Sequence, residues 1–132
     1  MSLKYTAITT FAGTAFASLP TDKPGVYNEG SFTCHFNYLE DADVNTFLDD
    51  LQALGGDEQP GKLGKSLGYQ YAFVKRILVS VEGIAGESGN LPPETQFDIV
   101  LSNQTLWLAA LKAFLENRNG APAKNSKPSQ KR

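Results

Sequence analysis

Residues 31 to 38 carry the clearest structural signal in the chain, because apolar and polar side chains alternate along them. Phe32, Cys34 and Phe36 occupy every second position, and His35 is one of the polar residues between them. This period places the apolar residues on one face of a β-strand and the polar residues on the other. We therefore predict a half-buried strand over residues 31–38, with Cys34 in the core and His35 at the surface.

After this strand, apolar residues recur every third or fourth position, which is the spacing of one face of an amphipathic helix. Asp41 and Asn103 precede two such rows and can cap them with side-chain oxygens. Ile77, Val79 and Val81 are β-branched, so a strand over the last third of the second row is the alternative to helix there. We predict helices over residues 41–54 and 66–82, a short third helix beginning at Pro93, and a fourth ending at Asn119 and Gly120. The predicted fold class is mainly α, a small helical domain with a short N-terminal β-strand or hairpin element.

Residues 1–30 show neither period, and glycines and prolines interrupt them. Their apolar side chains need a surface to cover, so we expect an arm or a loose hairpin that docks on its own domain or on a neighbouring subunit. The uncharged segment Tyr5–Thr21 is too rich in threonine to span a bilayer, and it lacks the continuous apolar block of a secretory signal. We divide the chain into this arm, a helical domain over residues 31–120 and a tail over residues 121–132, and we expect no membrane partner.

The formal net charge of −2 conceals an asymmetry between the tail and the rest of the chain. Four of the 12 basic residues and none of the 14 acidic residues lie in 121–132, which leaves 8 basic and 14 acidic residues, or −6, elsewhere. Four dispersed cations with no aromatic residue for base stacking are a weak nucleic-acid signal. We expect a disordered, solubilising tail and no nucleic-acid partner.

Few residues in the chain could support catalysis. The only histidine and the only cysteine are sequence neighbours, and neighbours in a strand point to opposite faces, so they cannot form a dyad or a zinc site. The Gly61–Ser66 loop ends like a phosphate-binding loop, but Gln59 stands where the first glycine is required. We predict no catalytic residue, no metal and no cofactor; a small enzyme is the third alternative, recognisable by a pocket that gathers perturbed titratable groups. A lone cysteine can close no disulfide within the chain, which favours a cytosolic protein.

The order of these elements carries a family resemblance over about residues 31–125. The stretches concerned are Phe32–Tyr38, Glu40–Leu54, Val74–Ile84, Glu87–Pro92, Phe97–Leu115 and Gly120–Asn125. In this order they resemble the tail assembly chaperones that long-tailed bacteriophages encode just ahead of their tape-measure gene. The chain departs from the pattern at Ser80-Val81, where many relatives carry Gly-Trp before Glu-Gly.

The resemblance implies a chaperone that binds the long, largely helical tape-measure protein and keeps it soluble in the host cytoplasm, and that is absent from the mature virion. It also implies a homo-oligomer, which the apolar arm favours too, and a frameshifted longer form, with slippery codons near residues 123–125, that recruits the tail tube protein. The candidate partner-binding residues are Tyr69, Phe73, Trp107, Lys124, Asn125, Lys127, Lys131 and Arg132. The aromatic members of this set have the same pattern as core residues. The alternative function is a structural virion component, such as a tail-completion or head-tail joining protein.

Overall fold

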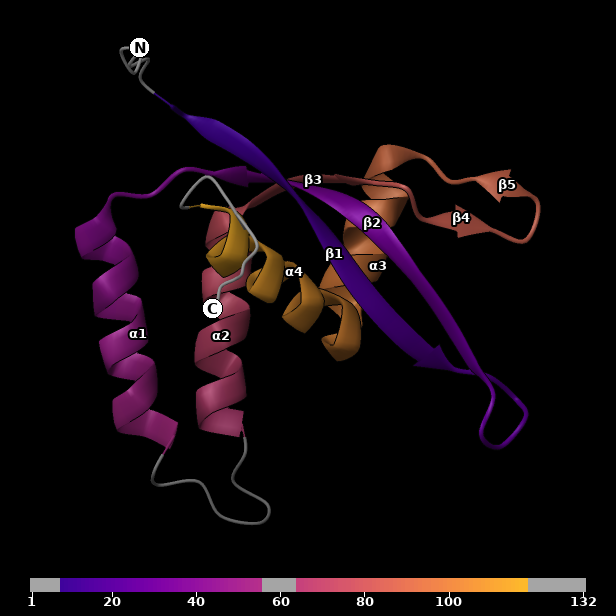
Figure 1. Cartoon of the computed structure of the whole chain (residues 1–132), viewed down its shortest axis with the longest axis horizontal. Coiled ribbons are helices and arrows are strands. Elements are labelled where there is room, and N and C mark those ends of the chain that lie inside the picture. The colour runs from indigo at the N-terminus through magenta and orange to yellow at the C-terminus, as the bar shows by residue number, and fades with distance from the viewer. Residues whose placement is uncertain (1–7, 56–63, 119–132) are drawn as a thin grey trace, which may run out of the picture.

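The computed structural model describes residues 8–55 and 64–118, which fold into a three-stranded antiparallel sheet, four helices and a very short second hairpin (Figure 1). The elements are β1 (Thr10–Pro20), β2 (Tyr27–Asn37), α1 (Asp41–Gly55), α2 (Gly64–Ile77), β3 (Leu78–Glu82), β4 (Ala85–Gly86), β5 (Gly89–Asn90), α3 (Pro93–Ser102) and α4 (Gln104–Asn117). Helices make up 50% of the structure and strands make up 31% of it. The fold is mixed α/β, so the prediction of a mainly α domain is wrong.

A long β-hairpin is the main reason for this correction. β1 and β2 pair antiparallel in continuous register from Thr10–Asn37 to Pro20–Tyr27, and the three-stranded sheet has the order β1-β2-β3. The hairpin alternative for the first 30 residues is therefore found from Thr10 onward, and the strand predicted over 31–38 begins at Tyr27. Small residues dominate both strands at this end, so the apolar–polar alternation that identifies a strand is weak there.

The second predicted helix also ends earlier than expected. α2 stops at Ile77, and residues Leu78–Glu82 form β3, which pairs antiparallel with β2. Val81 lies opposite Cys34 and is 2% exposed. Burial against β2 favours the β-branched residues in a strand, so the helix predicted over 66–82 is wrong in its last five residues and the strand alternative is confirmed.

The helix starts are only partly as predicted. Asn103 caps α4, because its side-chain oxygen accepts a hydrogen bond from the backbone N–H of Leu106 at 3.2 Å. Asp41 is not the cap of α1: the carbonyl of Glu40 accepts the first helical hydrogen bonds, and the Asp41 carboxylate accepts one from Arg118 at 2.6 Å. A long-range ion pair therefore replaces the local cap expected there.

One hydrophobic core joins the sheet to the helices. α4 packs along β1 and α3 packs against β3, while α1 and α2 pair at one end of the sheet (Figure 1). Phe114 of α4 is fully buried and contacts the rings of Phe11, Phe36 and Phe73 at centroid distances of 5.4 to 5.6 Å. Ala15 of β1 is 1% exposed in the same core, so the hairpin packs against the helices through this strand.

Candidate binding groove

The hairpin extends beyond the rest of the sheet. β3 pairs only with residues 33–36 of β2, after which Gly83, with a φ of +102°, turns the chain away. The backbone angle favours glycine, whereas a Cβ atom at this position would lie at an ordinary contact distance, 3.4 Å, from the Cα atom of Phe32. Residues 27–32 of β2 consequently have no third strand beside them among the described residues.

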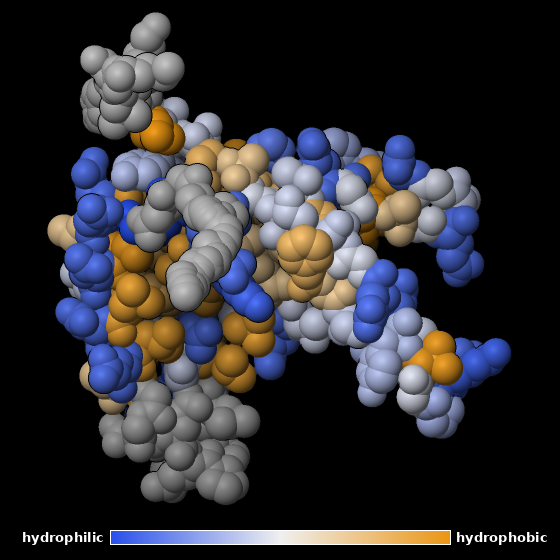
Figure 2. Space-filling model, in the orientation of Figure 1, coloured by the Kyte–Doolittle hydropathy of each residue, from blue (hydrophilic) through white to orange (hydrophobic). Residues whose placement is uncertain are grey.

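A groove of about 390 Å³ occupies this position, between the hairpin and the loop that carries β4 and β5. Figure 2 shows the hairpin tip and the β4–β5 loop as two projections separated by an open notch. None of the described residues that line the groove is titratable, so it can bind apolar groups but has no acid, base or nucleophile. Its apolar lining consists of Ala17, Leu19, Phe32, Ile84, Ala85, Leu91, Ile99 and Leu106.

Gln96 of α3 fixes the wall of the groove formed by the β4–β5 loop. Its side-chain oxygen accepts a hydrogen bond from the backbone N–H of Ile84 at 2.8 Å, and its side-chain nitrogen donates to the carbonyl of Leu91 at 2.8 Å. Gln96 is only 6% exposed, so both bonds are shielded from water. The loop is thus held at both ends by one side chain, and the groove is formed before any partner arrives.

The acidic residues nearest to this groove in sequence do not line it. Glu29 pairs with Ser18 and Glu82 pairs with Thr33, so both side chains point to the face of the sheet opposite Ala17 and Phe32, whereas Glu87 lies in the turn between β4 and β5. Glu82 lies 3.6 Å from the Nε2 atom of His35. The groove therefore offers apolar contacts, and its sheet wall selects no charge on the partner.

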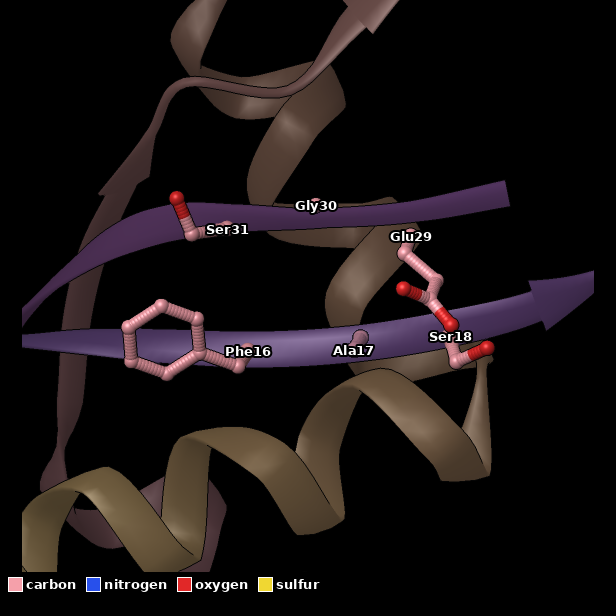
Figure 3. Close-up of a pocket in the computed structure, with 6 residues that line it drawn as sticks. All are labelled: Phe16, Ala17, Ser18, Glu29, Gly30 and Ser31. Atoms are coloured by element: carbon pink, nitrogen blue, oxygen red, sulfur yellow. The ribbon is translucent and has the colours of Figure 1, made fainter. Parts of the chain in front are cut away.

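A second concavity, of about 500 Å³, lies on the hairpin itself. Figure 3 shows the ring of Phe16 projecting from β1 and the Glu29 side chain reaching across the strands toward Ser18. Phe16 is 75% exposed, which is unusual for a phenylalanine. This surface offers an apolar contact and one carboxylate, an arrangement that favours contact with another protein over catalysis.

Of the three predicted partner-binding residues that the structure describes, Tyr69 and Phe73 line one pocket of about 230 Å³ between α1 and α2, and Trp107 is not part of it. Phe73 and Trp107 are each 6% exposed: Phe73 stacks on Phe47 with a centroid distance of 3.7 Å, and Trp107 packs against Tyr71. Both are core residues in this structure. Tyr69 is half-buried beside Phe47. Lys124, Asn125, Lys127, Lys131 and Arg132 lie outside the described residues.

The hydroxyl of Tyr69 donates a hydrogen bond to Asp50 at 2.9 Å and joins α2 to α1. Desolvation and this hydrogen bond raise the pKa of Tyr69. The contact ties the two helices together, so a structural role accounts for the residue.

The other sequence candidates have structural roles as well. Cys34 is fully buried, and burial raises the pKa of its thiol to about 12, so the prediction of a core cysteine is confirmed. The Ser66 hydroxyl accepts a hydrogen bond from Gln70 at 3.2 Å within α2, and residues 56–63 of the loop before it lie outside the described residues. The described residues contain no cluster of three or more His, Cys, Asp or Glu suited to a metal ion. No helix in the described ranges has the length and hydropathy of a membrane span.

Sequence reasoning missed the groove and Gln96. The lack of charged residues along β1 was the signal for the groove in the sequence. The depth of the groove arises from the β4–β5 loop, which is distant from β1 in sequence. The chain matches no family model, and no curated protein or solved structure is significantly similar to it. The site must therefore be interpreted from its own geometry.

Proposed function

We propose that this protein is a bacteriophage tail assembly chaperone that binds apolar side chains of the tape-measure protein in the groove between the hairpin and the β4–β5 loop. The observation that carries the proposal is the apolar groove, whose loop wall is held in place by Gln96. This groove lies between a hairpin and a loop, and none of the predicted partner-binding residues within the described ranges lines it.

The size of the groove suits a client that must later be released. Burying one Leu or Phe side chain contributes about 1.5–3 kcal/mol, whereas a micromolar complex requires about 8 kcal/mol. A single groove therefore binds one or two client side chains weakly. An amphipathic tape-measure helix presents such side chains along its length, and many chaperone copies on one client would multiply these weak contacts.

We propose that this protein acts in the host cytoplasm. A chaperone of this kind acts in the host cytoplasm, leaves when tube subunits polymerise around the tape-measure protein, and is absent from the mature virion. Recruitment of the tail tube protein through a frameshifted longer form belongs to the same proposal.

The test compares two leucine-to-lysine variants. Leu19 lines the groove, whereas Leu48 on α1 is 41% exposed and lies outside it. We expect Leu19→Lys to weaken binding of the co-expressed tape-measure protein at least about tenfold, because it places a charge among apolar groups. Leu48→Lys should change binding by less than about twofold. Equal effects of the two variants would exclude the groove as the client site.

The alternative, a structural virion component, is favoured by one specific observation, the open edge of β1 described below. Mass spectrometry of purified particles separates the two functions. A structural component would be present at a fixed stoichiometry, whereas a chaperone would be absent.

A further inference from the structure

β1 forms an edge of the sheet along its whole length. It pairs with β2 on one side, and no strand among the described residues pairs with its other side. None of the 11 residues of β1 is charged, its register with β2 has no bulge, and its one proline, Pro20, is the last residue. Natural proteins protect exposed edges with charges, prolines, bulges or a covering element. Among the described residues this long edge has no charge, bulge, internal proline or covering strand, so we expect it to be paired in the functional state.

The backbone of β1 presents regular hydrogen-bonding groups to this edge. The carbonyl of Thr9 accepts a hydrogen bond from the N–H of Tyr38 at 2.9 Å. Hydrogen-bonded pairs alternate along an antiparallel ladder, so the odd-numbered residues of β1 point their backbone groups toward β2. The N–H and C=O groups of Ala12, Thr14 and Phe16 therefore point toward the open edge.

The surface is hollowed beside the middle of this edge. A trough of about 480 Å³, lined by Thr14, Phe16, Glu116 and Asn117, lies between β1 and α4. Lys112 lines its continuation along α4. The rim of the trough thus carries one positive and one negative residue on the same helix.

We propose that the β1 strands of two copies of this chain pair antiparallel about a twofold axis and form one continuous six-stranded sheet. The same edge serves both copies, which is the requirement of a twofold interface. An uncharged edge lets two acidic chains meet without placing like charges together, and Lys112 of each copy can face Glu116 of the other. The exposed Phe16 side chains then lie beside the shared edge and are covered. This proposal does not depend on the proposed function.

Two variants of the full-length chain test the pairing by sedimentation equilibrium. Thr14→Pro removes an N–H that points to the open edge and leaves the hydrogen bonds to β2 intact. Phe16→Lys places a like charge in both copies at the shared edge. Val79→Lys is the control, since Val79 is 46% exposed on the strand at the other side of the sheet.

We expect a dimer at high micromolar concentration for the native chain and Val79→Lys, and at least a tenfold weaker association for the two edge variants. Unchanged dimerisation in a folded Thr14→Pro or Phe16→Lys variant would overturn the proposal. A native chain that remains monomeric would overturn it too, and protected Ala12, Thr14 and Phe16 amides in that monomer would show that the chain covers its own edge.

Oxidative cross-linking gives a second readout, which reports which positions meet in the dimer. Because Cys34 is buried, cysteines introduced singly at positions 12, 14 and 16 are the accessible thiols of their variants. We expect disulfide-linked dimers from at least one of the three and none from Ser80→Cys on β3. Cross-linking at Ser80→Cys alone would overturn the twofold pairing of β1.

Discussion

Gln96 connects the stability of the fold to the shape of the groove, so replacing it tests both. Gln96→Met keeps the length of the side chain but removes the hydrogen bonds to Ile84 and Leu91, each 2.8 Å long. Each bond contributes about 0.5–1.5 kcal/mol, and a buried partner left unpaired costs about 1–3 kcal/mol. Ile84 and Leu91 are half-buried, so we expect the variant to lose about 2–3 kcal/mol of unfolding free energy.

The assay is denaturant unfolding followed by the fluorescence of Trp107, the only tryptophan. Gln104→Met is the matched control, because Gln104 is exposed on α4 and its replacement should change stability by less than about 0.5 kcal/mol. Hydrogen exchange of the Ile84 amide should accelerate in Gln96→Met. If the two variants are equally stable and this amide exchanges at the native rate, Gln96 does not hold the loop.

A pH titration of Gln96→Glu checks the same geometry. One carboxylate oxygen can accept from Ile84, but the other faces the Leu91 carbonyl, so burial and repulsion should raise its folded pKa above the unfolded value of about 4.3. The folded state then binds more protons, and stability relative to the native chain falls as the pH rises through this interval. We expect the smallest loss below pH about 4, where the protonated acid can donate to Leu91. A loss that does not vary with pH would contradict this arrangement.

Three further predictions follow from other contacts. The thiol of Cys34 has a pKa of about 12 in the folded chain, against 9.0 for an ordinary cysteine. The difference in unfolding free energy between the native chain and Cys34→Ala should therefore fall by about 1.4 kcal/mol between pH 8 and pH 10. A difference that does not change with pH would contradict the burial of this thiol. Arg118 donates hydrogen bonds to Asp41 and to the Leu39 carbonyl, so Arg118→Met should lower the unfolding free energy by about 1–2 kcal/mol in the same denaturant assay. Asp41→Asn should lower it by less than about 1 kcal/mol. Deleting residues 121–132 should leave the unfolding free energy nearly unchanged and weaken client binding at low salt only, and equal affinities at both salt concentrations would exclude a role for this segment.

Local periodicity was sufficient to predict the elements whose structure depends mainly on residues that are close in sequence. The apolar residues at helical spacing before and after Asn103 predicted α3 and α4 and the boundary between them. This was possible because the capping residue and the apolar face are both formed by residues that are close in sequence. The strand around Cys34 was predicted for the same reason. Burial of Cys34 itself follows from the alternation and needs no knowledge of the tertiary fold.

The remaining fold depends on contacts between distant segments. β3 is a strand because Val81 pairs with Cys34, 47 positions earlier, and this outweighs the helical row that runs into it. β1 was missed because alanine, glycine and threonine give almost no apolar alternation, although they suit a strand packed closely against α4. The groove was not predictable, since Gln96 determines its wall through hydrogen bonds to residues 84 and 91.

The most direct test of the proposed function is the hydrogen-exchange footprint of the full-length chain with and without the co-expressed tape-measure protein. We predict slower exchange in the distal hairpin around Leu19 and Asn28 and in the loop over residues 84–91, with little change in α1. Protection confined to α1 and α2, or no complex at all, would contradict the assignment of the groove as the client site.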